Sequence, residues 1–376
     1  MKILHLIYTT GIAGAEKYLV NLLPGLKEYN IDCDLICVCP KSAIPIITTY
    51  CEMMKSKGIK VTLLIGGKKN FLFIVKSINN YLKQEGINII HAHLSSADLL
   101  AVLIKTMYNK KLFIISSKHG YDEKYLVKYS ADAKRHKIDR NLYYYFTKLL
   151  LNKINVNLAI SKAISDLYFN IKLTPKPYPY IHHGIPETEI DNDIAQLNQI
   201  IIIGRLENMK GHKFLLEAMP EVIKHFPSIR LLILGEGSEK YNLQKQATDL
   251  GIEKEIIFMG FQTDPYTYIR QSKIIILPSL FEPFGLVYIE AFSLKVPVVA
   301  FDVPAANEII INNETGILIQ RFDSQMLSQK IIYLLSNNEK RKELSEKAYQ
   351  KFLEYYTEKR MVKETATWYI SLGIYK

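Results

Sequence analysis

Short apolar runs alternate with helical patterns along the whole chain. The runs are rich in Ile, Leu and Val, and the stretches between them repeat apolar residues every three or four positions, as amphipathic helices do. Such an alternation predicts a parallel sheet with helices on both faces. The runs form two series, the first at residues 3–8, 34–38, 61–65, 89–92, 113–116, 157–160 and 180–182, and the second at 199–203, 230–234, 256–259, 274–277, 298–300 and 316–319.

The break between the two series predicts the domain organisation. A polar, acidic stretch separates them, and a chain of 376 residues exceeds the usual size of one hydrophobic core. We therefore predict an α/β fold with two Rossmann-like domains facing each other across a cleft. The expected parts are an N-terminal domain at 1–186, a linker at 187–196, a C-terminal domain at 197–355 and a last helix at 356–376.

The composition is that of a soluble globular protein, with 48% hydrophobic and 23% charged residues. No run of about eighteen apolar residues occurs, so we expect no transmembrane helix. The first fifteen residues imitate a signal peptide, but polar residues interrupt the apolar run, and we expect a first strand instead. The spacing of the four cysteines does not suit zinc, so reduced thiols and a cytoplasmic location are expected.

The positive charge lies in the N-terminal half. Residues 1–190 carry 26 Lys and Arg against 14 Asp and Glu, whereas residues 191–376 carry 22 against 23. The excess is dense at 105–148, where cations alternate with Tyr, Leu and Phe, a mixture that suits an anionic membrane surface or a phosphate-bearing acceptor. A solvated basic face is the alternative, and we expect no nucleic-acid partner because no nucleic-acid-binding motif accompanies the patch.

Two glutamates, Glu282 and Glu290, flank the predicted start of a helix after the run at 274–277. Ligands of open α/β sheets bind at the carboxyl ends of strands, and the free amides of the following helix suit a phosphate. Glu290 would accept hydrogen bonds from a diol such as a ribose. The alternative is structural, because acidic side chains also stabilise helix N-termini.

Two cations, Arg205 and Lys210, lie in a tight loop at the carboxyl end of the run at 199–203. Both can converge on one anion, Arg as a bidentate clamp and Lys as a compact charge. They would stabilise a departing diphosphate without a metal. The alternative is a pair of surface cations.

These motifs resemble the retaining GT-B glycosyltransferases of family 4, also called group 1. The resemblance covers nearly the full chain and is strongest at 204–316. One departure is Lys295, where the family usually has glycine. In the family the last helix packs back on the N-terminal domain. The matching motif residues are Glu282, Phe284, Gly285, Glu290, Ala291, Pro297 and Val298, with Gly204, Arg205, Leu206, Lys210 and Gly211 in the earlier loop.

The resemblance also implies roles for individual residues. Glu282 and the amides after it would orient the donor sugar, and His119 would position the sugar or the acceptor. The implied catalytic residues are His119, Glu282, Arg205 and Lys210, and the implied acceptor-side residues are His93, His119 and Tyr121. The implied donor-binding residues are Gly14, Arg205, Lys210, Gly235, Gly237, Phe258, Gly260, Glu282, Phe284, Gly285, Leu286 and Glu290.

The implied activity is transfer of a hexose or N-acetylhexosamine from a nucleotide diphosphate sugar, with a UDP-sugar as the expected donor. The expected acceptor is a membrane-associated or cell-surface glycan or glycolipid, and peripheral attachment to the inner face of a membrane would follow. Two Asp-x-Asp patterns, at 32–34 and 191–193, are remote from any predicted phosphate loop, so we expect no essential metal or other cofactor. A sugar-nucleotide epimerase and a non-catalytic partner subunit remain alternatives.

Overall fold

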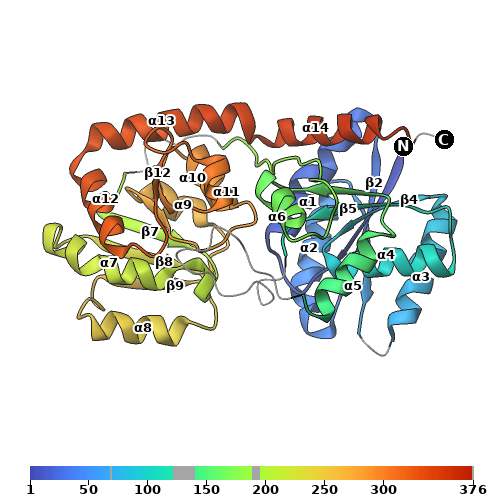
Figure 1. Cartoon of the computed structure of the whole chain (residues 1–376), viewed down its shortest axis with the longest axis horizontal. Coiled ribbons are helices and arrows are strands. Elements are labelled where there is room, and N and C mark those ends of the chain that lie inside the picture. Colours follow the sequence, from blue (N-terminus) through green and yellow to red (C-terminus); the bar gives the residue numbers. More distant parts are fainter. Residues whose placement is uncertain (68–69, 122–139, 189–194, 375–376) are drawn as a thin grey trace. The chain divides into compact units, whose positions relative to one another are not determined.

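The structure is a computed structural model that describes residues 1–67, 70–121, 140–188 and 195–374. The described chain divides into two compact units, seen in Figure 1. Of the described residues, the N-terminal unit contains 1–67, 70–121, 140–186 and 358–374, and the C-terminal unit contains 187–188 and 195–357. Among the described helices, none combines the length and apolar character needed to cross a bilayer.

The N-terminal unit is built on a six-stranded parallel sheet in the order β3-β2-β1-β4-β5-β6. Its core is formed by the buried apolar faces of the helices and strands. The strands are β1 (Lys2–Tyr8), β2 (Asp32–Cys39), β3 (Lys60–Ile65), β4 (Ile89–His93), β5 (Phe113–Lys118) and β6 (Val156–Ala159). The helices are α1 (Gly14–Leu26), α2 (Ile44–Ser56), α3 (Phe71–Glu85), α4 (Ser95–Met107), α5 (Leu142–Leu151), α6 (Lys162–Asn170) and α14 (Glu358–Ser371).

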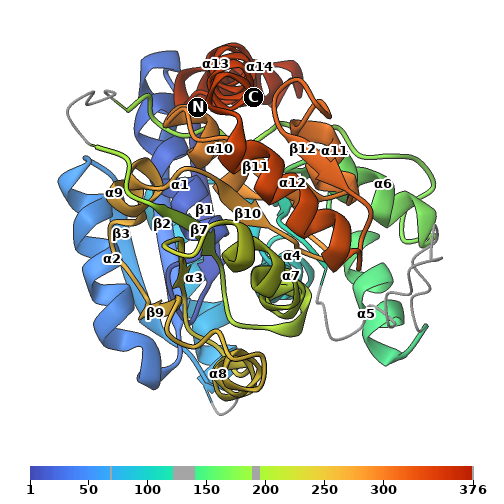
Figure 2. The same cartoon turned by 90° about the vertical axis from the view of Figure 1, so that its left-hand side faces the viewer.

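The C-terminal unit repeats this plan with the strand order β12-β11-β10-β7-β8-β9. Figure 2 shows this unit in front, and α12 packs beside α7 there. The strands are β7 (Gln199–Ile203), β8 (Arg230–Leu234), β9 (Ile256–Gly260), β10 (Ile275–Leu277), β11 (Val298–Phe301) and β12 (Ile317–Ile319). The helices are α7 (His212–His225), α8 (Lys240–Asp249), α9 (Pro265–Gln271), α10 (Leu286–Ser293), α11 (Pro304–Ile309), α12 (Ser324–Ser336) and α13 (Asn338–Tyr355).

Each sheet has one point at which the strand order reverses. In the N-terminal unit it lies between β1 and β4, and in the C-terminal unit between β7 and β10. Loops that leave two such neighbouring strands turn to opposite faces of the sheet and leave a crevice at the carboxyl ends. Ligand-binding residues are therefore expected in the loops that follow β1, β4, β7 and β10.

The last helix, α14, belongs to the N-terminal unit although it ends the chain. It packs against α1, and Figure 1 shows the two helices together on this unit. Val362 lies so close to Gly25 that a Cβ there would meet Val362 Cγ2 at 2.9 Å, and Tyr369 is completely buried. The backbone amide of Glu358 donates to the carbonyl of Ile185 at 2.8 Å. These contacts attach the C-terminus to the first domain's core.

The strands occur where the apolar runs predicted them, with one exception. The prediction of a strand at 180–182 was wrong, because Tyr180 forms only an isolated bridge with Ala159. The amide of Ile181 donates to the carbonyl of Ala159 at 3.1 Å, so the segment does approach the edge of β6. Pro177 and Pro179 precede it and have no amide hydrogen to donate, which prevents a longer ladder there.

The turn after α10 places Lys295 in the left-handed conformation, with φ of 54°. The amide of Lys295 donates to the carbonyl of Phe292 and that of Val296 to Ala291, at 3.1 and 3.0 Å, which is the hydrogen-bond pattern that usually carries glycine at this position. The ammonium group of Lys295 pairs with Glu346 at 2.7 Å and lies 4.6 Å from the ring centroid of Tyr349. These side-chain contacts offset the strain of a non-glycine residue.

We expect Lys295→Gly to be more stable than Lys295→Ala by about 1 kcal/mol. Both variants lose the contacts to α13, but only glycine relieves the left-handed backbone. Urea unfolding of the two purified variants measures the difference directly. Equal stabilities would contradict the assignment of strain to this position.

Candidate functional site

The loops that follow β7 and β10 meet at the switch point of the C-terminal unit. The ammonium group of Lys210 lies 2.6 Å from Glu282 Oε1, and both side chains are largely buried. The hydroxyl of Ser279, two residues beyond β10, donates to the same oxygen at 2.8 Å. The carboxylate is thereby fixed in orientation by two donors on one oxygen, and Oε2 is oriented with it.

Glycines allow the loops of this site to approach one another closely. Gly211 has φ of +71°, and a Cβ there would meet the carbonyl oxygen of Pro278 at 1.8 Å. Gly235 has φ of +143°, and a Cβ would meet the carbonyl oxygen of Gly204 at 2.0 Å. Any larger residue at either position would push the backbone of the neighbouring loop away. The spacing between Lys210 and Glu282 therefore depends on these glycines.

The remaining predicted donor residues surround the same edge of the sheet. Arg205 is exposed in the loop after β7, and Gly237 packs against the backbone of Leu206. The carbonyl of Gly260, at the end of β9, accepts from the amide of Gly235 at 2.8 Å. The ends of β7, β8 and β9 are thus connected by their backbones, with Phe258 two residues before Gly260.

The helix α10 holds the second glutamate. Gly285, with φ of +91°, precedes its first residue, Leu286, and Glu290 follows in the second turn with 2% of its surface exposed. Burial, and then the nearby charge of Glu290, raise the pKa of the Tyr266 hydroxyl. Phe284 is buried and packs on Tyr356, so its side chain supports the loop. A ligand reaching this loop would find its backbone amides and Glu282.

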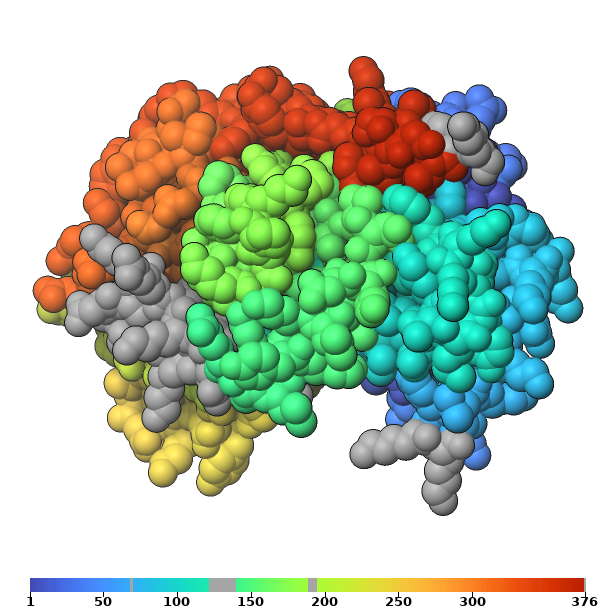
Figure 3. All heavy atoms as spheres, turned by 45° about the vertical axis from the view of Figure 1, so that its right-hand side comes forward, coloured from blue at the N-terminus to red at the C-terminus, as the bar shows by residue number. Residues whose placement is uncertain are grey.

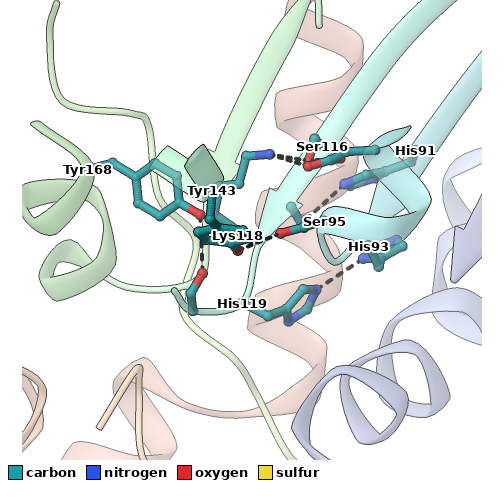
Figure 4. A network of polar contacts seen from close by, with 11 residues as sticks. His91, His93, Ser95, Ser116, Lys118, His119, Tyr143 and Tyr168 are labelled. Carbon is teal, nitrogen blue, oxygen red and sulfur yellow. Dashed lines mark hydrogen bonds and ion pairs between the residues drawn. The ribbon is translucent and has the colours of Figure 1, made fainter. Parts of the chain in front are cut away.

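A second polar cluster occupies the switch point of the N-terminal unit (Figure 4). His93 ends β4 and His119 directly follows β5, and His93 Nδ1 lies 3.1 Å from His119 Nε2. Burial, and then the charge of Lys118, lower the pKa of His119 to about 3, so the ring is neutral. Tyr121, two residues after His119, is buried and contacts Tyr143 and Tyr168 edge to face. Gly14 begins α1, on the loop after β1.

The predicted residues therefore fall into two groups. The donor residues from Arg205 to Glu290 lie together in the C-terminal unit, and Gly14, His93, His119 and Tyr121 lie in the N-terminal unit. Residues 122–139 of the basic segment at 105–148 lie outside the described residues, as does the Asp-x-Asp pattern at 191–193. In the pattern at 32–34, Asp34 accepts from Tyr81 and pairs with Lys2.

Sequence reasoning missed three kinds of residue. Ser279 carried a usable signal, since it lies in the same loop after β10 as Glu282. The buried ion pair of Asp98 and Lys118 and the contact between His5 and His93 carried no signal, because strand order alone brings them together.

Two family descriptions match consecutive parts of the chain. "Glycosyltransferase Family 4" matches residues 12–189 and "Glycosyl transferases group 1" matches residues 187–351. Paired Rossmann-like units with a polar site at a switch point define an α/β protein with the GT-B fold. The chain belongs to the group 1, family 4 glycosyltransferases, and this confirms the predicted fold and resemblance.

Individual relatives are distant in sequence. A Campylobacter jejuni protein named "N-acetylgalactosamine-N,N'-diacetylbacillosaminyl-diphospho-undecaprenol 4-alpha-N-acetylgalactosaminyltransferase" is 25% identical over 91% of this chain and 92% of its own length. A Staphylococcus aureus poly(ribitol-phosphate) alpha-N-acetylglucosaminyltransferase is 25% identical over 57% of this chain and 43% of its own. The structure of Anabaena HepE with UDP and glucose has a TM-score of 0.81 at 18% identity and covers 99% of this chain and 100% of that one, which shows the fold.

Proposed function

We propose that the protein is a retaining glycosyltransferase that moves a hexose or N-acetylhexosamine from a UDP-sugar to a lipid-linked or cell-surface glycan without an essential metal. The observation that carries the proposal is the pair formed by Lys210 and Glu282 at the β7–β10 switch point. A cation and an oriented carboxylate side by side suit a ligand that presents a diphosphate next to sugar hydroxyls. The names of the relatives support the donor and acceptor classes.

In the proposed reaction the bond between the anomeric carbon and the diphosphate oxygen breaks, and its electron pair stays on the diphosphate. Arg205 and Lys210 would stabilise that growing negative charge. The acceptor oxygen bonds to the anomeric carbon on the face from which the diphosphate leaves, and its proton passes to a diphosphate oxygen. Glu282 is held by Lys210 and Ser279, so it suits binding of sugar hydroxyls through Oε2 better than nucleophilic attack.

The test incubates the purified full chain with a panel of nucleotide sugars, with and without lipid-linked glycan acceptors, in the presence of a chelator. We expect UDP release that depends on acceptor, and a product whose anomeric configuration, read by NMR, matches the donor. Isomerised donor without acceptor would instead identify an epimerase. Donor binding without turnover of any donor and acceptor pair would identify a non-catalytic subunit.

We also propose that α5 attaches the protein peripherally to an anionic bilayer. Leu142, Tyr145, Phe146 and Leu149 recur at helical spacing and are 85%, 58%, 42% and 59% exposed. Figure 3 shows the green α5 at the surface of the N-terminal unit. The segment 140–153 also carries Arg140, Lys148 and Lys153 and no acidic residue. An apolar face bordered by cations matches acyl chains beneath anionic head groups, where each cation contributes about 1 kcal/mol.

We expect the full-length protein to float with vesicles containing phosphatidylglycerol and to float less with phosphatidylcholine alone. Replacing Leu142, Phe146 and Leu149 together by serine should abolish flotation, because it removes most of the apolar face. The matched control replaces Leu72 and Phe73, which are 63% and 67% exposed on α3 of the same unit. Flotation that survives the α5 changes, or that ignores lipid charge, would refute the proposal. The cytoplasmic location stays a prediction.

A further inference from the structure

Histidines from two strands and from the loop after a third gather at the switch point of the N-terminal unit. His5 lies in β1, His91 and His93 lie in β4, and all three are completely buried. His119 follows β5 and is partly exposed. Parallel pairing places His5 beside His91 and His93 beside Ser117, one position before the end of β5. Strand register therefore aligns the rings across the sheet.

Two hydrogen bonds connect three of these rings in a row. His5 Nδ1 lies 3.0 Å from His93 Nε2, and His93 Nδ1 lies 3.1 Å from His119 Nε2, the contact drawn in Figure 4. Both nitrogens of His93 are thus engaged. The two end atoms, His5 Nε2 and His119 Nδ1, are buried and have no hydrogen-bond partner among the described residues.

The rings in this row are neutral. Burial lowers the pKa of His5 to about 3 and that of His93 well below its ordinary value, with the neighbouring histidines acting in the same direction on His93. A neutral imidazole has one N–H donor and one acceptor nitrogen. Because His93 must donate at one nitrogen and accept at the other, both hydrogen bonds run in the same direction. The tautomer of His119 is therefore tied to that of His5.

The surroundings of His5 and His119, the two ends of the row, decide in which direction the hydrogen bonds run. Both end atoms are buried without a partner, but His5 is completely buried in β1, whereas His119 is partly exposed at the carboxyl end of β5. An unpaired N–H therefore costs more at the His5 end than at the His119 end. The favoured arrangement puts the His5 proton on Nδ1, donating to His93, and the His93 proton on Nδ1, donating to His119 Nε2. The remaining proton of His119 then lies on Nδ1.

We propose that His5 and His93 are positioning residues that fix His119 as the Nδ1–H tautomer, a hydrogen-bond donor to an oxygen of the bound sugar or acceptor. The identity of this oxygen ligand rests on the proposed function, whereas the tautomer does not. With Nε2 occupied by His93 and Nδ1 protonated, His119 cannot take the acceptor's proton in the ground state. This tautomer is compatible with the proposed reaction, in which the departing diphosphate takes that proton.

A metal ion is the rival explanation, since the nearest ring nitrogens of His5, His91 and His93 lie within 4.8 Å of one another. However, His91 contacts Ser117 Oγ at 2.8 Å through Nε2 and the hydroxyl of Tyr369 at 2.5 Å through Nδ1. The ring of His93 stacks on His91 and His5, with interplanar angles of 25° and 14°. Nearly parallel rings do not direct their lone pairs at one point, as a tetrahedral ion requires.

The test is long-range proton–nitrogen NMR of the full-length protein labelled with 15N-histidine, at neutral pH and without substrate. We expect His119 to carry its proton predominantly on Nδ1, because the other tautomer places the unpaired N–H at the completely buried His5 instead of at the partly exposed His119. His5→Phe should bring the two His119 tautomers towards equal populations. His91→Phe is the control, because it changes an equally buried ring outside the hydrogen-bonded row.

A His119 proton on Nε2 in the native protein would overturn the proposal, as would an unchanged ratio in a folded His5→Phe variant. The His119 tautomer in the spectrum of the unaltered protein tests the proposal even where a variant fails to fold. Stoichiometric zinc chloride should leave the spectrum unchanged, and a joint shift of His5, His91 and His93 would favour a metal site instead. Since no substrate is present, failure of this proposal is distinguishable from failure of the proposed transferase activity.

Discussion

Lys210→Met is expected to lower kcat for sugar transfer by about 100- to 1000-fold, the usual cost of removing one group that stabilises a charge developing in the transition state. Lys210 is the better-placed cation of its loop, because its ammonium group already lies 2.6 Å from Glu282. An ammonium group has three hydrogens, so a diphosphate oxygen can bind while the glutamate contact persists. Methionine keeps most of the side-chain length but removes the charge.

The measurement is steady-state kinetics with the donor found by the nucleotide-sugar screen. Lys213→Met, in the first turn of α7, is the matched control, because that lysine is exposed and lies over the ring of Phe214. We expect the control to retain activity. If kcat in Lys210→Met stayed within a few-fold of the native value, the assignment of Lys210 to the leaving group would be wrong.

Stability has to be separated from catalysis in this experiment, since Lys210→Met leaves the largely buried Glu282 with Ser279. The double variant Lys210→Met with Glu282→Gln removes both charges and should recover stability. It should not recover activity. Recovery of turnover in the double variant would mean that the ion pair acts only on folding.

The fold was largely predictable because its signals are local. A buried parallel strand is a short apolar run, and turn residues mark its ends. The same reasoning failed at Tyr180, where two prolines limit pairing. It marked Lys295 as a departure from the family's glycine but did not predict that Lys295 itself adopts the left-handed conformation. Those outcomes depend on backbone geometry at single residues.

The candidate site was predictable only as a set of separate loops. Arg205, Lys210, Glu282 and Glu290 could each be selected because they follow a strand. The direct contact of Lys210 with Glu282 spans 72 positions and exists because β7 pairs with β10. The row from His5 through His93 to His119 likewise depends on strand order and register. Neither can be predicted from the spacing of residues along the chain.

A second large effect is expected in the N-terminal unit, where Asp98→Ala should destabilise folding by about 3–5 kcal/mol. Asp98, on α4, lies 2.6 Å from the ammonium group of Lys118 at the end of β5, and the two side chains are 6% and 5% exposed. The hydroxyl of Ser116 contacts both of them. Alanine would leave the charge of Lys118 buried without its partner, and the total stability of a domain is only about 5–15 kcal/mol.

The chain provides a local probe for this measurement. Trp368 is the single tryptophan and packs on the core of the N-terminal unit, so its fluorescence during urea unfolding reports on that unit. Asp166→Ala is the control, because Asp166 pairs with Lys162 on the exposed surface of α6 and should contribute at most about 0.5 kcal/mol. A loss below about 1 kcal/mol for Asp98→Ala would contradict a desolvated ion pair.

The double variant Asp98→Leu with Lys118→Met tests whether the loss of stability comes from the unpaired charge of Lys118. Replacing both members of a buried pair by apolar residues of similar volume is often neutral or stabilising, so we expect most of the lost stability to return. Because Lys118 immediately precedes His119 and its charge helps to keep that ring neutral, the double variant should raise the pKa of His119. Burial is the larger cause of the lowered pKa, so His119 should still be neutral at pH 7 and its proton should stay on Nδ1.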